Sequence, residues 1–109
     1  MKLASLKGPT RDGTLVLVNR ALTTAVSAAG IAPTMQHALE HWDSLHTKLL
    51  DACESLECGN ERHAFDFRAA LAKGEVAAPL PRAYEWLDGS AYLSHVERVR
   101  RARGDTVPA

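Results

Sequence analysis

Three short stretches near the start of the chain carry the apolar and polar patterns of β-strands. Residues 2–7 alternate apolar and polar side chains, and residues 14–20 form a continuous run rich in β-branched residues, the clearest strand signal in the sequence. The residues between them are dense in turn formers and end in Asp12-Gly13, a pair typical of β-hairpins. Residues 23–28 predict a third strand, although their alanines would suit a helix equally. A sheet this small needs another element to pack against.

The next stretch predicts the helix that covers this sheet. Its apolar residues recur at steps of three and four and form one continuous stripe at helical period. The stripe comprises Met35, Leu39, Trp42, Leu45, Leu49, Cys53 and Leu56. Pro33 precedes Thr34, which suits the N-cap position, and Gly59-Asn60 ends the pattern in the manner of a C-cap. The pattern therefore predicts one long helix from Thr34 to Gly59.

Two weaker signals follow the long helix. Residues 68–72 predict a short helix, and residues 75–81 predict a strand that runs into Pro79-Leu80-Pro81. A proline on either side of Leu80 favours an extended connection over a helix.

We place a domain boundary at this proline pair, with an amino-terminal domain at residues 1–78 and a second segment at residues 79–109. Within the second segment, residues 84–87 predict a short strand and residues 91–103 predict a helix that Gly104 ends. The expected fold class is α+β, with a small amino-terminal β unit packed on one long helix, then a proline-bounded strand and a carboxy-terminal helix.

Composition narrows the class of protein. The chain has 109 residues, of which 46% are apolar and 24% are charged, as expected of one modest globular domain. Its 13 Lys and Arg residues balance its 13 Asp and Glu residues, which argues against a nucleic-acid or membrane-surface partner. The sequence shows neither an apolar run long enough to span a membrane nor the apolar core of a signal peptide at its start. We therefore expect a cytoplasmic protein.

Cys53 and Cys58 are five positions apart on the predicted helix. That offset turns them to different faces, so a disulfide between them would be strained or impossible. Two cysteines also fall short of the four ligands of a structural zinc site. We expect both to be buried or half-buried free thiols.

The long helix also carries His37, His41 and His46. His37 and His41 stand at i and i+4 and could face one metal ion, but the zinc-protease pattern needs glutamate directly after the first histidine, where Ala38 stands. We interpret these histidines as solvated or half-buried helix residues.

A basic cluster lies near the end of the last predicted helix and comprises Arg98, Arg100, Arg101 and Arg103. Cations at that position complement the negative end of the helix dipole. A phosphate or RNA contact is the alternative reading.

The most informative pattern lies between Ala78 and Gly104. His95 follows Tyr92 by one helical turn and Asp88 by two, near the start of the last predicted helix. A histidine that follows a strand and a glycine turn can project into a cleft, and its titration near neutrality suits a general base. A surface or core histidine is the alternative reading.

This stretch, APLPRAYEWLDGSAYLSHVERVRRARG, resembles bacterial fumarylacetoacetate hydrolase-like proteins, as do the opening MKLASLK and the Arg11-Asp12-Gly13 turn. The resemblance is to the amino-terminal region of that family and extends over nearly all of the chain. The resemblance implies that His95 is the general base acting on the water that attacks the substrate carbonyl. It implies that Asp88 ligates a divalent metal ion, and more weakly that Tyr92 contacts substrate. Some relatives place an orienting glutamate three residues after the histidine, whereas Glu97 lies two residues after His95.

The resemblance implies hydrolytic cleavage of a carbon–carbon bond in a β-diketo acid, of the fumarylacetoacetate or acylpyruvate type found in aromatic catabolism. In the family, Mg²⁺ or Ca²⁺ holds the diketone and stabilises the enolate. The remaining metal ligands of the family, a Glu-x-Glu pair among them, lie in a carboxy-terminal domain, and this chain has no Glu-x-Glu.

We therefore expect an amino-terminal fragment that is inactive alone and has the missing catalytic domain as its partner. Family members commonly form homodimers through that domain. The alternative is a non-catalytic α+β interaction module, in which the last helix folds back over the sheet and buries Val96 and Val99.

Overall fold

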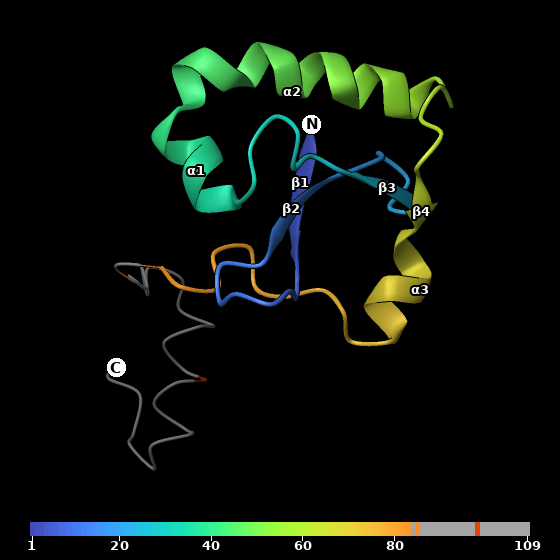
Figure 1. Ribbon diagram of the computed structural model, residues 1–109. Coiled ribbons are helices and arrows are strands. Elements are labelled where there is room, and N and C mark those ends of the chain that lie inside the picture. Colours follow the sequence, from blue (N-terminus) through green and yellow to red (C-terminus); the bar gives the residue numbers. More distant parts are fainter. Residues whose placement is uncertain (84, 86–97, 99–109) are drawn as a thin grey trace, which may run out of the picture.

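The computed structural model describes residues 1–83, 85 and 98, and its central feature is a four-stranded antiparallel sheet (Figure 1). The strands pair in sequence order, and they are β1 (Lys2–Leu6), β2 (Thr14–Val18), β3 (Thr24–Ser27) and β4 (Phe65–Asp66). The first three confirm the predicted strands, and Ala25 of the third lies in the sheet, whereas Ala28 follows the end of β3. Together with the helices that pack on this sheet, they confirm an α+β fold.

The β1–β2 hairpin depends on a glycine at its turn. Gly13 adopts φ 70°, and a Cβ at this position would lie 2.4 Å from the carbonyl oxygen of Leu6. Only glycine tolerates both the left-handed backbone and this close approach. The hairpin predicted from Asp12-Gly13 is confirmed, with Leu6 paired to Thr14 next to the turn.

Strand β2 is buried on both faces of the sheet. Leu15 and Leu17 pack in one core cluster with Leu49 of the long helix, whereas Val16 and Val18 pack in a second cluster with Phe67. A strand covered on both sides carries a continuous apolar run, because neither face meets water. This double burial explains why residues 14–20 gave the clearest strand signal.

The prediction of one uninterrupted helix is wrong. The helical stretch consists of α1 (Met35–Glu40) and α2 (Trp42–Glu57), which meet at His41 with φ −119° and ψ 29°. The hydroxyl of Ser44 donates to the His41 carbonyl oxygen at 3.0 Å, a local bond that favours a helix start over a helix interior.

The break at His41 changes which side chains the stripe buries. Leu39 and Trp42 flank it and are 49% and 36% exposed, although the predicted stripe placed both on the buried face. Met35, Leu49 and Leu56 are buried as expected. The N-cap is also confirmed, because Thr34 Oγ1 accepts a hydrogen bond from the His37 backbone N–H at 3.1 Å.

Helix α3 (Phe67–Ala72) confirms the short helix predicted at residues 68–72. Asp66 caps it, since its Oδ1 accepts a hydrogen bond from the Ala69 backbone N–H at 3.0 Å. The preceding strand β4 was not predicted, because two residues are too few to show an alternating pattern.

The strand predicted at residues 75–81 is wrong. Val76 forms an isolated bridge to Leu6, and no named strand follows within the described residues up to 83. The physical reason is that Pro79 and Pro81 have no backbone N–H to donate to a ladder.

Several predictions lie outside the described residues. They are the strand at residues 84–87, the helix at residues 91–103 and the burial of Val96 and Val99. The boundary between residues 78 and 79 stays a prediction. In the described part of the chain, no helix has the length and apolar character needed to cross a membrane.

Candidate functional site

The chain between α3 and the predicted site residues lies along the outer edge of β1. We call residues 75–82 the anchored segment. The Lys7 backbone N–H donates to the Glu75 carbonyl oxygen, and the Ala77 backbone N–H donates to the Ser5 carbonyl oxygen, both at 2.8 Å. These two bonds place the start of the anchored segment antiparallel to the end of β1.

Ser5 holds the middle of the anchored segment through its side chain. Its hydroxyl donates to the carbonyl oxygen of Pro79 at 2.7 Å. Ser5 is 0% exposed, and it is the one fully buried polar residue in the described part of the chain. Burying a hydroxyl costs free energy unless it is hydrogen bonded, so the bond to Pro79 satisfies a group that the fold itself buries.

Arg82 holds the end of the anchored segment on the β1–β2 turn. Its Nε and Nη2 atoms donate to Oδ1 and Oδ2 of Asp12, each at 2.9 Å. The hydrogen bond from Arg82 lowers the pKa of the Asp12 carboxyl below its ordinary value, and the charges of Arg82 and Arg11 act in the same direction. Such a bidentate pair fixes orientation as well as distance.

The predicted site residues follow the anchored segment in sequence. Arg82 precedes Asp88 by six positions and His95 by 13. His95, Asp88 and Tyr92 themselves, and Glu97 with them, lie outside the described residues. The structure therefore describes the anchored segment, and from its last residue, Arg82, the chain continues toward the predicted site residues.

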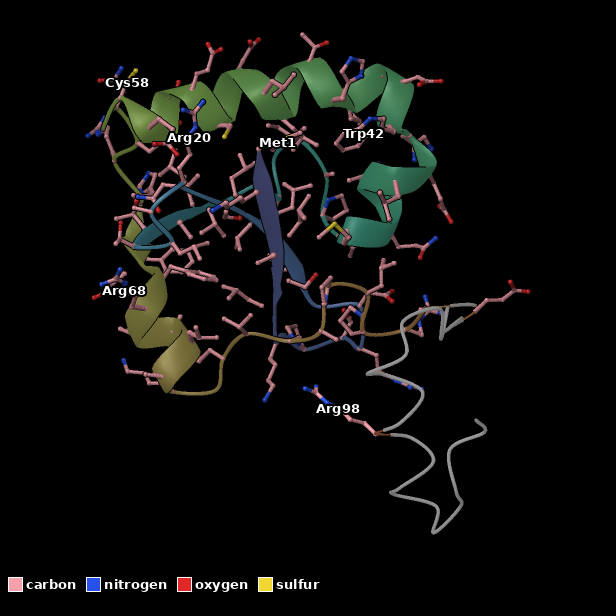
Figure 2. The ribbon with its side chains drawn as sticks, turned by 180° about the vertical axis from the view of Figure 1, so that it is seen from behind. Met1, Arg20, Trp42, Cys58, Arg68 and Arg98 are labelled. Atoms are coloured by element: carbon pink, nitrogen blue, oxygen red, sulfur yellow. The ribbon has the colours of Figure 1, made fainter. Side chains whose placement is uncertain are left out.

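A separate concavity lies between α2 and the start of β1. Figure 2 labels Met1, Arg20 and Cys58 from its lining. Its volume is about 340 Å³, and its lining includes Met1, Lys2, Arg20, Cys53 and Glu57. Two of its charged side chains bond to the backbone of Arg20: Glu57 Oε1 accepts from the Arg20 N–H at 2.5 Å, and Lys2 Nζ donates to the Arg20 carbonyl oxygen at 2.8 Å. This pairing ties the end of α2 to the β2–β3 connection.

Both cysteines are free thiols. Cys53 is half-buried as predicted, whereas Cys58 is exposed, contrary to the prediction. The reason is that Cys58 is the C-cap of α2 and lies beyond the part of the helix that packs on the sheet (Figure 2).

The helix histidines confirm the interpretation made from their spacing. His37 and His46 are half-buried and His41 is exposed. The rings of His37 and His41 stack with centroids 4.3 Å apart, and Nδ1 of His41 lies 3.0 Å from the His37 carbonyl oxygen. Among the described residues, no group of three or more His, Cys, Asp or Glu side chains could hold a metal ion.

Sequence reasoning missed the roles of Ser5 and Arg82. A serine in an alternating strand reads as a solvent-facing residue, and Arg82 lies 70 positions from its partner Asp12. The one available signal was that both residues lie in stretches that carried the family resemblance: Asp12 lies in the Arg11-Asp12-Gly13 turn, and Arg82 directly follows the proline pair.

Comparison with known proteins gives one family. The family model described as fumarylacetoacetase N-terminal domain 2 matches residues 1–82, which is 82 of the 109 residues. Among curated proteins, none matches this chain. The matched region begins just before β1 and ends at Arg82, the last residue of the anchored segment. The chain therefore belongs to the fumarylacetoacetase N-terminal domain 2 family.

Proposed function

We propose that this chain serves as the amino-terminal domain of a fumarylacetoacetase-family hydrolase that cleaves a carbon–carbon bond in a β-diketo acid. The observation that carries the proposal is the family match over residues 1–82. The sequence that follows this match holds His95, Asp88 and Tyr92, the residues that resemble the family's site. The anchored segment supports the proposal because it ties the start of that sequence to the domain.

In the proposed reaction, His95 acts as the general base. Its imidazole takes a proton from water, and the water oxygen forms a bond to the substrate carbonyl carbon. The adjacent carbon–carbon bond then breaks, and its electron pair leaves with the other fragment as an enolate. The enolate carbon receives the proton that His95 took from water, so the products are a carboxylic acid and a ketone fragment, and the base is restored. Tyr92 is proposed as a substrate contact.

The described residues do not provide a site for the Mg²⁺ or Ca²⁺ that the family implies. Hard cations need several oxygen ligands, and no suitable group of three occurs in the described part of the chain. We therefore propose Asp88 only as one contributing ligand of the ion.

The proposal assigns the remaining ligands to a carboxy-terminal catalytic domain. The absence of a Glu-x-Glu pair from this chain supports that assignment. On this proposal the chain alone does not turn over substrate, and its partner is the catalytic domain, through which two copies of the enzyme would also associate. The substrate class fits a cytoplasmic step in the breakdown of aromatic compounds.

The test is hydrolysis of fumarylacetoacetate in the presence of Mg²⁺, followed by the loss of its ultraviolet absorbance. The chain is assayed alone and then mixed with a carboxy-terminal domain of the family. We expect turnover in the mixture only, and we expect His95→Ala to abolish it. The matched control is His63→Ala, because His63 is an exposed histidine in the connection before β4. An inactive mixture would favour the non-catalytic interaction module.

A further inference from the structure

We infer that Ser5, Asp12 and Arg82 are positioning residues for the proposed reaction. They hold the anchored segment in one course along β1 and the β1–β2 turn, and so fix the point from which the chain continues toward Asp88 and His95. This inference rests on the proposed function, and it gives the described residues a role in it, which is to place the residues that react.

The attachments are spread along the whole anchored segment. Hydrogen bonds to the domain occur at Glu75, Ala77, Pro79 and Arg82, so no more than two consecutive residues lack one. Three of these four attachments go to β1 or to the residue after it, and the fourth, at Arg82, goes to the β1–β2 turn. The partners thus belong to one rigid hairpin, whose strands are paired along their full length.

The chain between the last two attachments has little freedom. Pro79 and Pro81 lock their own φ angles, and each proline also restricts the residue before it. Leu80 packs against the core cluster of the α2 side, which fixes it further. The position of Arg82 is therefore determined by the same hairpin that holds Pro79.

The Asp12–Arg82 pair suits positioning better than stabilisation. Both side chains are partly exposed, and ion pairs of that kind contribute little to the free energy of unfolding. Bidentate geometry, however, defines the orientation of the guanidinium as well as its distance from the carboxylate. A displacement of a reacting group by about 1 Å can lower a catalysed rate on the order of 100-fold, and the inference therefore predicts that loss of the Asp12–Arg82 pair lowers kcat.

The first part of the test uses the chain alone and measures amide hydrogen exchange. In Asp12→Asn we expect the Ala77 amide to exchange on the order of threefold faster or more, because local opening of the anchored segment becomes easier. The amides of Leu17 and Val26, which lie within the sheet, should keep their protection. Asp51→Asn is the matched control, since it removes a carboxylate exposed on α2. Unchanged exchange at Ala77 in Asp12→Asn would overturn the inference.

The second part uses the mixture with the catalytic domain and separates kcat from KM. We expect Asp12→Asn and Ser5→Ala each to lower kcat on the order of 10-fold or more while KM changes by less than about twofold, because the domain places the base rather than the substrate. Asp12→Glu, which can again accept two hydrogen bonds, should recover part of the lost kcat.

The outcomes distinguish the two proposals. If the wild-type mixture is active and Asp12→Asn keeps its kcat, the positioning role is wrong and the proposed function stands. A raised KM with an unchanged kcat would also overturn positioning, because it would indicate a substrate contact. If the wild-type mixture is inactive, the proposed function fails and the inference that rests on it fails with it.

Discussion

Ser5 and Pro79 lie 74 positions apart in the sequence and are joined by a 2.7 Å hydrogen bond from the serine hydroxyl to the proline carbonyl oxygen. Ser5 belongs to the first strand of the domain, and Pro79 lies near the end of the region that the family model matches. The bond therefore attaches the last part of the matched region to its first strand.

Ser5→Ala removes this bond and leaves the Pro79 carbonyl oxygen without its partner. We expect the free energy of unfolding to fall by about 1–2 kcal/mol, the range for a lost hydrogen bond with one partner left behind. Urea unfolding at neutral pH measures this change in the free energy of unfolding. Ser55→Ala, at a half-buried position on α2, is the control and should change stability by less than about 0.5 kcal/mol. Equal effects of the two substitutions would contradict a structural role for the Ser5 hydroxyl.

The Asp12–Arg82 pair makes stability depend on pH in a defined direction. Arg82 lowers the pKa of Asp12 below 3.8 in the folded protein, so the contribution of the pair is fully present above that ordinary value. It is lost as the pH falls through the lowered pKa. Wild type should therefore be slightly more stable than Asp12→Asn at neutral pH, and this small difference should shrink only below about pH 4.

Unfolding curves of both proteins at several pH values check this dependence. Carbon NMR measures the pKa of the Asp12 carboxyl independently of unfolding. Arg82→Gln should return that pKa toward the ordinary value. A difference in stability that stays constant down to the most acidic pH would contradict the ion pair.

Leu49 and Leu50 are adjacent on α2 and differ only in the face they occupy. Leu49 is 0% exposed in the core, whereas Leu50 is 43% exposed. Leu49→Ala should lower the free energy of unfolding by about 2–5 kcal/mol, because it removes buried methyl groups and leaves a cavity. Leu50→Ala should cost less than about 0.5 kcal/mol. Denaturant unfolding at 25 °C compares them, and similar losses would show that α2 packs in another register.

Leu22 adopts φ 60° in the β2–β3 connection and is 46% exposed. The left-handed region is unfavourable for a leucine and well tolerated by asparagine, so Leu22→Asn should raise the free energy of unfolding by about 0.5–1 kcal/mol. Leu39→Asn is the control, since Leu39 is equally exposed but helical. That substitution should lower stability by roughly 0.5 kcal/mol through helix propensity. A loss of stability in Leu22→Asn would indicate that the leucine makes a contact outweighing its strain.

The sequence predicted most of the elements because their patterns are local. The run at residues 14–20 identified β2, Asp12-Gly13 identified the hairpin, and Thr34 identified a helix start. The break at His41 was not predictable from periodicity, because the apolar spacing continues across it. The exposure of Leu39 and Trp42 follows from that break and was missed for the same reason.

The candidate site likewise has one part that a continuous stretch of sequence predicted and one part that it did not. His95, Asp88 and Tyr92 came from resemblance within one continuous stretch, and they stay predictions. The attachments made by Ser5 and Arg82 join residues far apart in the sequence, and no spacing rule relates them. Proline content indicated an extended connection at residues 79–81 but not the attachment of Pro79 to Ser5.

Hydrolysis in ¹⁸O-labelled water tests the central claim most directly. The chain, mixed with a family catalytic domain and Mg²⁺, is given fumarylacetoacetate, and the products are analysed by mass spectrometry. We predict that the acyl fragment carries one oxygen atom from water in its new carboxylate, and that His95→Ala yields no labelled product. Unlabelled products from a cleaved substrate, or equal labelling with wild type and His95→Ala, would contradict hydrolysis of a carbon–carbon bond by this histidine.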